Sequence, residues 1–323
     1  MKSAEKIFVA GHRGLVGSAI CRGLQSQGYE NLLLKSRVEV DLTDKASVSE
    51  FFERERPDYV FLAAAKVGGI VANDTYPADF IRENLEIQTN VIDAAYRSGV
   101  KRLLFLGSSC IYPKLCPQPI KEEYLLTGQL EPTNRAYALA KIAGIEMCWS
   151  YNRQYGTRFL AAMPTNLYGP NDNFDLKNSH VLPALIRKTA EAKASGQKSI
   201  TVWGTGTPRR ELLYSDDLAQ ASIFLMNMPD VEFARLMSAD EPPLINIGTG
   251  EDITIRGLAE LVCKVVGFDG ELIFDTSRPD GTPRKLLDVS RINSLGWKAQ
   301  TGLDEGIRRV YESVKEQFLV AAT

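Results

Sequence analysis

Two short segments of the chain carry side chains that could move protons to and from a carbonyl oxygen. Tyr137 and Lys141 are four residues apart, so a helix here would place both on one face about one turn apart. A phenol ionises near pH ~10 in water, and a neighbouring ammonium favours the phenolate. With Ser108 holding the carbonyl oxygen, the set predicts proton exchange with an alcohol or ketone. Alone, a tyrosine and a lysine at this spacing usually mark a solvated helix face.

A glycine-rich segment near the amino terminus predicts a dinucleotide site. The apolar run 7–10 indicates a buried strand that leads directly into the loop, and a helical pattern follows through Leu24. The glycines would permit the tight turn, the approach of a pyrophosphate and close packing of helix on strand. The expected cofactor contacts here are Gly11, His12, Arg13, Gly14, Leu15, Val16 and Gly17. A glycine-rich turn in another kind of α/β protein is the alternative.

The residues after the second expected strand, 32–34, predict which cofactor binds. An NAD-binding protein places an acid here, about 20 residues after the loop, to accept hydrogen bonds from the ribose 2′-hydroxyl. This chain has Lys35, Ser36 and Arg37 instead. Arg37 and Arg13 could flank a 2′-phosphate, which favours NADP(H) over NAD. Alternatively, one of these arginines is merely exposed.

Composition excludes several classes of protein. The 323 residues contain 38 Lys and Arg against 40 Asp and Glu, which argues against a nucleic-acid or membrane-surface partner. Five cysteines without a C-x-x-C pair, and only two histidines, make a structural metal site improbable and favour a reducing cytoplasm. No apolar run approaches the ~18 residues of a membrane span, and none resembles a signal peptide. We expect a soluble cytoplasmic protein.

The first half of the chain alternates apolar runs with helical segments, which predicts a doubly wound parallel α/β sheet of the Rossmann type. The expected strands are 7–10, 32–34, 59–65, 103–107 and 158–163. Asp41 and Leu42, at the end of another short strand, and the run 62–65 would pass the adenine and the pyrophosphate. The alanines of that run fit simple packing of a crowded strand equally well.

The chain length favours a second, smaller lobe. The polar segment 171–179 predicts the crossing, so residues 1–175 form the cofactor lobe and 176–323 mainly the substrate lobe. Beyond the crossing we expect a helix over 180–194 and strands at 199–203 and 244–250. Segment 212–228 is expected to return to the first lobe, with Asp216 as a helix N-cap.

Four motifs in order give the chain a family resemblance. They are Gly11-x-x-Gly14-x-x-Gly17, Tyr137-x-x-x-Lys141, Pro164-x-Asn166-x-Tyr168-Gly-Pro170 and Trp203-Gly-x-Gly. Together they resemble the extended short-chain dehydrogenase/reductases that act on nucleotide sugars. The strings 63–73, 107–114, 150–156, 178–181 and 280–288 are more specific, and resemble the branch that epimerises and reduces GDP-4-keto-6-deoxy-D-mannose. The resemblance covers nearly the whole chain.

The resemblance implies a two-stage reaction in one site. C3 and C5 of the sugar are inverted through enediolates, and hydride from NADPH then reduces the C4 ketone. Ser108, Tyr137 and Lys141 would act at the C4 oxygen, while Cys110 resembles the base of the inversion and His180 its acid. Cys110 is two residues beyond Ser108, so we expect it on the same side of an extended segment. Without the resemblance, an inert buried thiol is the better expectation for Cys110, and local packing is equally plausible for His180.

The resemblance also implies the remaining contacts of the GDP-sugar and of the cofactor. The cofactor residues are Arg37, Asp41, Leu42, Leu106, Gly107, Ser108, Ser109, Lys141, Pro164, Thr165, Asn166, Leu167 and His180, and the substrate residues are Lys188, Trp203, Arg210 and Asp280. Trp203 could stack on guanine and Arg210 hold phosphate, although a tryptophan at a strand end is core by default. The resemblance further implies a homodimer formed through the helix of Tyr137 and its neighbour.

Two residues depart from the family pattern, and three other functions stay open. Ala136 stands where proline often precedes the tyrosine, and Lys188 replaces a common arginine, so a point charge replaces a bidentate fork. A related branch performs the same chemistry on a 3-deoxy sugar. An epimerase or dehydratase could instead keep its nicotinamide bound throughout. An NADP-sensing regulator would have no need of Tyr137 and Lys141.

Overall fold

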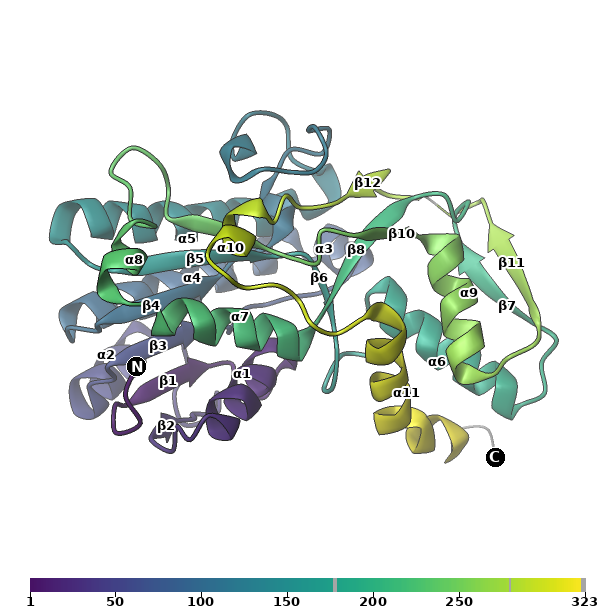
Figure 1. Ribbon diagram of the computed structural model, residues 1–323, viewed down its shortest axis with the longest axis horizontal. Helices are drawn as coiled ribbons and strands as arrows, with labels where there is room; N and C mark the ends of the chain where they lie inside the picture. Colours follow the sequence, from purple (N-terminus) through teal and green to yellow (C-terminus); the bar gives the residue numbers. More distant parts are fainter. Residues whose placement is uncertain (177–178, 279, 321–323) are drawn as a thin grey trace.

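The computed structural model describes residues 1–176, 179–278 and 280–320, arranged as two lobes (Figure 1). The larger lobe contains the amino terminus and a six-stranded sheet, and the smaller one contains the C-terminal helix α11 (Leu303–Val320). Asn178, the first residue of the string 178–181, lies outside the described residues. No helix in the described part of the chain is both long and apolar enough to cross a membrane.

The large sheet confirms the predicted doubly wound parallel fold. Its strands are β1 (Ile7–Ala10), β2 (Leu32–Leu33), β3 (Tyr59–Leu62), β4 (Arg102–Leu106), β5 (Phe159–Pro164) and β9 (Leu244–Ile247). They lie in the order β2-β1-β3-β4-β5-β9, and every neighbouring pair is parallel. Strands β2 and β3 lie on opposite sides of β1. The strand order therefore reverses at β1, and in such sheets a ligand binds outside the carboxyl ends of the strands at this point.

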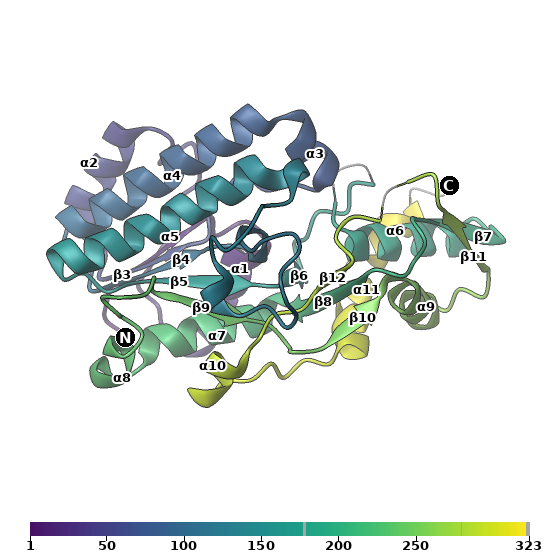
Figure 2. The same cartoon turned by 90° about the horizontal axis from the view of Figure 1, so that it is seen from above.

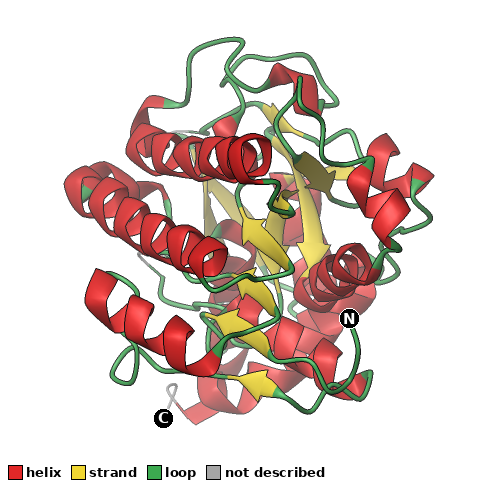
Figure 3. Cartoon of the chain, turned by 90° about the vertical axis from the view of Figure 1, so that its left-hand side faces the viewer, coloured by secondary structure: helices red, strands yellow, loops and turns green. Residues whose placement is uncertain are grey.

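Helices cover both faces of this sheet (Figures 2 and 3). One face carries α1 (Leu15–Ser26), α7 (Ser215–Asn227), α8 (Asp230–Ala234) and α10 (Ser290–Ser294), and the other α2 (Lys45–Glu55), α4 (Pro77–Arg97) and α5 (Arg135–Tyr155). The short helix α3 (Ile70–Thr75) precedes α4, and three 3-10 turns, η1 (Ser109–Ile111), η2 (Glu122–Tyr124) and η3 (Pro132–Asn134), lie between β4 and α5.

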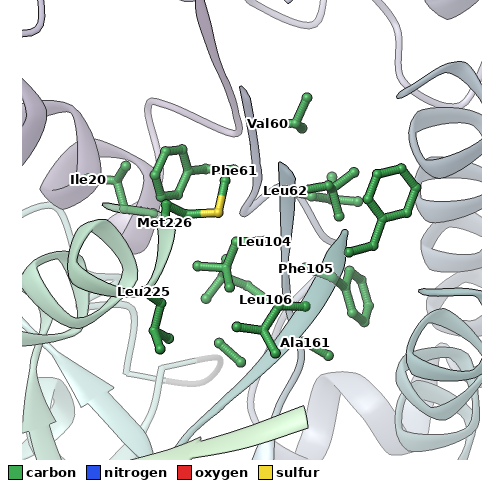
Figure 4. Close-up of a cluster of buried hydrophobic side chains, with 14 of the residues drawn as sticks. Ile20, Val60, Phe61, Leu62, Leu104, Phe105, Leu106, Ala161, Leu225 and Met226 are labelled. Atoms are coloured by element: carbon green, nitrogen blue, oxygen red, sulfur yellow. The ribbon is translucent and has the colours of Figure 1, made fainter. Parts of the chain in front are cut away.

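The core explains why the central strands are continuously apolar. Successive side chains of a strand point to opposite faces, and here both faces are covered. Figure 4 shows Phe61 and Leu104 on the side of Ile20 and Met226, while Leu62 and Phe105 point the other way. All six residues are buried.

The smaller lobe has its own core, built on Tyr168, Leu258 and Ile307. Its elements are β6 (Asn166–Tyr168), α6 (Val181–Ala194), β7 (Ser199–Trp203), β8 (Arg209–Tyr214), β10 (Asp252–Thr254), α9 (Ile255–Val266), β11 (Glu271–Asp275), β12 (Arg284–Lys285) and α11. Strand β8 pairs with β6, β10 and β12, and β7 pairs with β11.

The segment 41–42 was predicted to end a strand, and that prediction is wrong. Asp41 Oδ1 accepts hydrogen bonds from the Thr43 backbone N–H (2.9 Å) and hydroxyl (2.7 Å), and Asp44 then caps α2. These local bonds satisfy the backbone in a turn, which is a common alternative to a strand for aspartate and threonine.

Two further expectations about 209–250 need correction. Asp216 is not an N-cap: it lies in the first turn of α7, where its carboxylate pairs with Arg22 of α1. The strand expected at 244–250 is shorter and pairs with β5 in the large sheet, so it joins the first lobe together with α7. The division into lobes at 175/176 remains a proposal.

Candidate active site

The predicted proton-transfer residues gather at the carboxyl end of β4. Ser108 and Cys110 follow this strand directly, and Tyr137 and Lys141 lie on the first turns of α5. The buried Lys141 donates a hydrogen bond from Nζ to the carbonyl oxygen of Leu106, the last residue of β4 (2.8 Å). The same nitrogen lies 5.7 Å from the ring centroid of Tyr137. One helix face therefore carries both side chains, as the spacing predicts.

The segment 108–110 is not extended, contrary to our expectation. Ser108 is the N-cap of η1, and its hydroxyl oxygen accepts a hydrogen bond from the Cys110 backbone N–H (3.4 Å). Serine commonly begins a helical turn in this way. The turn nevertheless places both Ser108 and Cys110 beside Tyr137. Ser108 interacts with the Tyr137 phenol through a hydrogen bond, and Cys110 interacts with it electrostatically.

Burial dominates the electrostatics of Tyr137 and Lys141. It raises the pKa of Tyr137 above its ordinary value, Cys110 raises it further, and only the bond to Ser108 opposes the shift. Burial also lowers the pKa of Lys141 to about 8. The expected lowering of the phenol pKa by Lys141 is therefore not seen. The physical reason is that Lys141 is directed at the Leu106 carbonyl while the surrounding protein removes water from the phenol.

Cys110 and His180 belong to different lobes, and the charge of Lys285 acts on both. Cys110 is 6% exposed, and burial raises its pKa, while the Lys285 ammonium on β12 opposes that rise. His180 is the N-cap of α6 and is exposed as a residue. Desolvation of its imidazole by the surrounding protein lowers its pKa, and the Lys285 charge lowers it further. Lys285 belongs to the string 280–288, but nothing in the sequence pointed to this convergence.

The glycine loop fits a pyrophosphate. Gly11 has a φ of +84°, and a Cβ built there would lie 2.8 Å from the backbone of Ala64. A Cβ at Gly17 would lie 2.1 Å from the carbonyl oxygen of Gly11. Gly14 is the N-cap of α1 and provides no side-chain cap, so the helix start is open to an anion. His12 adds a buried Nδ1 that has no partner among the described residues.

Of the two predicted arginines, Arg13 lies in the glycine loop after β1 and Arg37 lies at the corner after β2. Both are exposed, and Arg37 Nε lies 3.6 Å from Asp41 Oδ2. Glu39, which we had not singled out, accepts hydrogen bonds at one oxygen from the Ser36 N–H (2.8 Å) and hydroxyl (2.7 Å). These two bonds are the main reason that its pKa falls to about 2. Leu42 lies beside this corner, and its carbonyl accepts a bond from Asn90 on α4 (3.0 Å).

The turn expected beside the nicotinamide joins the two lobes. Pro164 ends β5, and Asn166 and Leu167 begin β6. Thr165 Oγ1 and Asn166 Nδ2 both donate to the carbonyl oxygen of Glu211 on β8, at 3.3 and 2.9 Å. Gly107 and Ser109 flank Ser108 after the neighbouring strand β4, where Gly107 N–H donates to the Ala162 carbonyl of β5 (2.9 Å).

Glu211 itself is a buried residue that sequence reasoning missed. Its carboxylate accepts hydrogen bonds from the backbone N–H of Gly250 and of Leu287, each at 2.8 Å. Burial raises its pKa, and these bonds oppose the rise. A charged residue beside two arginines resembles solvated surface in the sequence, so only the tertiary structure reveals it.

The four expected substrate residues lie at one end of the smaller lobe. Trp203 is 47% exposed rather than core, and Lys188 Nζ and the Arg278 guanidinium carbon lie 5.3 and 5.1 Å from its ring centroid. Asp280 accepts hydrogen bonds from the Thr205 N–H (2.7 Å) and hydroxyl (2.9 Å).

Arg210 completes this set. It donates to the carbonyl oxygens of Thr282 (2.6 Å) and Arg209 (2.8 Å), and the charge of Asp280 acts on it. A partly exposed indole with cations beside it, next to a guanidinium that is held in place, suits a flat base attached to phosphates.

Known proteins resemble this chain along nearly its whole length. A model of the NAD dependent epimerase/dehydratase family matches residues 7–248. GDP-L-fucose synthase 1 from Arabidopsis thaliana is 60% identical over 311 residues, 96% of this chain and 93% of the relative. GDP-L-fucose synthase from Escherichia coli (strain K12) is 55% identical over 312 residues, 96% of each chain. GDP-L-colitose synthase from Yersinia pseudotuberculosis is 37% identical over 305 residues, 94% of this chain and 96% of the relative.

Solved structures agree with this grouping. A GDP-6-OMe-4-keto-L-xylo-heptose reductase from C. jejuni superposes with a TM-score of 0.93 at 43% identity, covering 98% of this chain and 99% of the other. A GDP-L-fucose synthetase from Naegleria fowleri bound to NADP gives a TM-score of 0.85 at 27% identity, covering 100% and 98%. The chain therefore belongs to the NAD dependent epimerase/dehydratase family and, within it, to the GDP-L-fucose synthases.

Proposed function

We propose that this protein is an NADPH-dependent epimerase/reductase that converts GDP-4-keto-6-deoxy-D-mannose to GDP-L-fucose. The observation that carries the proposal is that Cys110, in the turn that begins at Ser108, interacts electrostatically with Tyr137 on α5 and with Lys285 of the smaller lobe. The Lys285 charge also acts on His180. The identities of 55–60% to GDP-L-fucose synthases support the same substrate. NADP(H) is the cofactor, as in the related structure bound to NADP, and the glycine loop fits its pyrophosphate.

In the first stage, the residues of the site move protons at C3 and C5. A hydrogen next to a ketone becomes acidic when the developing oxyanion is stabilised, and the hydrogen-bonded pair of Ser108 and Tyr137 would supply that stabilisation at the C4 oxygen. The thiolate of Cys110 takes the proton, and the electron pair moves onto the C4 oxygen. His180 returns a proton to the opposite face of the ring, which inverts the carbon.

In the second stage, the same oxygen receives a proton. NADPH, when bound, supplies the hydride that reduces C4. Tyr137 gives its phenolic proton to the C4 oxygen, and its raised pKa means that this proton is present at neutral pH. Lys141, held by the Leu106 carbonyl, keeps a positive charge within reach of the phenolate that remains.

The nucleotide would bind across the smaller lobe. We propose that Trp203 stacks on guanine, that Arg210 and Lys188 contact the phosphates, and that Asp280 holds the loop that follows Trp203. The cofactor would lie along the residues of the glycine loop, the corner at Arg37, Asp41 and Leu42, and the turn from Pro164 to Leu167. The reaction on a 3-deoxy sugar is less well supported, because the colitose synthase is only 37% identical.

We also propose a homodimer located in the cytoplasm. Helices α4 and α5 lie side by side on one face of the large sheet (Figure 2), and Leu139 on α5 is 39% exposed there. Two such pairs would form a four-helix interface. All five cysteines are free, which suits a reducing compartment. Light scattering of the purified protein would measure the mass of the assembly, and a monomer would refute the dimer.

One labelling experiment tests the proposed reaction. The protein is incubated with GDP-4-keto-6-deoxy-D-mannose and NADPH in heavy water, and the product is analysed by NMR. We expect deuterium at C3 and C5, with one NADPH consumed per product, whereas an enzyme that retains its nicotinamide would consume none. A protein that only senses NADP would give no turnover.

The Cys110→Ser variant assigns the base. A serine hydroxyl is far less acidic than a thiol, so we expect deuterium incorporation at C3 and C5 to fall by about 10²–10⁴-fold. Cys116→Ser, in the same loop and also near Lys285, is the matched control and should incorporate label normally. Unchanged exchange in Cys110→Ser would rule the thiol out as the base.

A further inference from the structure

We propose that Lys285 is a positioning residue whose positive charge favours the reactive thiolate form of the Cys110 side chain. The inference deepens the proposed function, in which Cys110 is the base of the epimerisation. It assigns to one lysine of the smaller lobe the activation of a thiol on the larger lobe. The reaction therefore depends on how the two lobes fit together.

The first support is the pocket next to the catalytic turn. Lys285 and Cys110 line the same pocket, together with Lys114, Glu131 and Arg284. Strand β12, which carries Lys285, is parallel to β8, with Lys285 opposite Arg210 (Figure 2). The pocket thus lies where the sugar-binding strands of one lobe meet the loop after β4 of the other.

The second support is that hydrogen bonds hold the backbone after Lys285 on two sides. On one side, Leu286 N–H donates to Gln118 Oε1 (2.9 Å), and Ile120 N–H donates to the Leu286 carbonyl (2.7 Å). Both partners belong to the loop that follows Cys110. On the other side, Leu287 N–H donates to the buried carboxylate of Glu211 (2.8 Å). These bonds hold the backbone next to Lys285 against the loop that follows Cys110.

The third support is the distribution of charge around the two groups. Cys110 faces the cations Lys285 and Lys141 and the phenol of Tyr137. Burial lowers the pKa of Lys285 and Arg210 lowers it further, whereas Cys110, Cys116 and Glu131 favour its charged form; Lys285 also acts on His180. Glu131 is already paired with Lys114 (2.8 Å), and Arg284 is paired with Asp252. The two other cations of the pocket, Lys114 and Arg284, are therefore each paired with a carboxylate, and Lys285 acts on the thiol more strongly than Lys141 does.

The chemistry requires such a cation. Only a thiolate can take the proton from C3 or C5, becoming a thiol as the electron pair moves onto the C4 oxygen. Burial raises the pKa of Cys110 and so works against this form, and Lys285 is the strongest of the groups that oppose it. The same positive charge lowers the pKa of His180, which makes the imidazolium a stronger acid.

The test measures the thiol directly, without substrate. The full-length protein is alkylated with iodoacetamide over a range of pH, and the rate at Cys110 is followed by mass spectrometry of its peptide. Removing the cation in Lys285→Met should move the midpoint of this profile to higher pH by about one unit, which slows alkylation below the midpoint about tenfold. Lys285→Arg keeps a positive charge and should stay within about threefold of the original rate.

Two comparisons make the result decisive. Arg284→Met removes a cation from the same strand that is already paired with Asp252, and should leave the Cys110 profile unchanged. Lys285→Gln replaces the methionine variant if the latter does not fold. An unshifted profile in a folded, uncharged variant would overturn the proposal. The titration uses no sugar, so its result does not depend on the labelling experiment. An unshifted profile would overturn the role of Lys285 even if labelling supported the proposed reaction, and a shifted profile would support that role even if labelling failed.

Discussion

At the scale of single residues, the site works with groups whose ionisation is set by burial more than by their neighbours. Tyr137 keeps its proton because water is removed from the phenol, while Lys141 is held at the Leu106 carbonyl. A tyrosine that is protonated at neutral pH is suited to give a proton to an alkoxide. The lysine stabilises the tyrosinate that is left after the transfer.

Replacing Tyr137 with Phe should abolish reduction. The ring still packs against Phe80, whose centroid lies 6.2 Å away, but no proton reaches the C4 oxygen. We expect the rate of NADPH oxidation to fall by about 10²–10⁴-fold. The decrease in NADPH absorbance measures it, and thermal unfolding checks that the variant is folded. A variant that still reduces the ketone at the normal rate would contradict the assignment.

The buried Lys141 should also make stability depend on pH. Its pKa is lowered from 10.5 to about 8 in the folded protein, so between these values the unfolded chain binds more protons than the folded one. Stability from this group therefore increases as the pH rises from 8 toward 10.5, and is lost as the pH falls from 10.5 to about 8, below which both states bind the proton. The full change corresponds to about 3 kcal/mol.

This contribution is isolated by comparison with Lys141→Met. The difference in free energy of unfolding between the original protein and the variant, measured by urea denaturation, should increase in favour of the original protein over that pH range. All other titrating groups are shared and cancel in the difference. A difference that stays constant with pH would mean that Lys141 has an ordinary pKa.

At the scale of elements, the cofactor site is made by the ends of strands. The loop after β1 approaches the backbone after β3, so that Gly11 contacts Ala64, and the corner after β2 lies next to them in the sheet. Arg13 and Arg37 thus lie in the segments that follow two adjacent strands, β1 and β2. Neither guanidinium is buried, so both are accessible to a phosphate.

Replacing Arg13 and Arg37 together with Met should reduce the preference for NADPH. A guanidinium that contacts a phosphate contributes a charge-assisted hydrogen bond. NADH has no 2′-phosphate, so the substitutions weaken the binding of NADPH and leave that of NADH unchanged. We expect the ratio of the dissociation constants for NADH and NADPH, measured by nucleotide fluorescence, to fall about tenfold or more. Arg22→Met, on α1 and paired with Asp216 of α7, serves as the control. An unaltered ratio in the double variant would refute the assignment.

At the scale of the whole molecule, Glu211 links the lobes. Its backbone carbonyl accepts hydrogen bonds from Thr165 and Asn166 after β5, and its carboxylate accepts them from Gly250 and Leu287. Gly248 is required beside it, because a Cβ there would lie 2.1 Å from the Glu211 Oε1 atom. One residue therefore joins the cofactor turn, the end of β9 and the segment after Lys285.

Replacing Glu211 with Gln should destabilise the protein. An amide has one accepting oxygen, so its NH₂ group would face one of the two backbone N–H donors and leave it buried without a partner. We expect the free energy of unfolding to fall by about 1–3 kcal/mol, measured by denaturant titration. Glu241→Gln, at an exposed position, should change it by less than about 0.5 kcal/mol. An equal effect of the two substitutions would show that the buried bonds contribute nothing.

The sequence by itself determined the features that depend on local pattern. Continuous apolar runs predicted the parallel strands, since a strand covered on both faces is apolar at every position. The glycine spacing predicted the loop after β1, because only glycine permits contacts as close as that between Gly17 and the Gly11 carbonyl. The spacing of Tyr137 and Lys141 predicted their common helix face, because the helical period is fixed by the backbone.

Only the tertiary structure decided which distant groups meet and in what state. Asp41 lies in a turn because its side chain bonds Thr43, and β9 joins the large sheet by pairing in parallel with β5. Lys285 reaches Cys110 and His180, and burial rather than Lys141 sets the pKa of Tyr137. Such effects depend on distance through space and on the exclusion of water, and neither quantity is encoded in the spacing of residues along the chain.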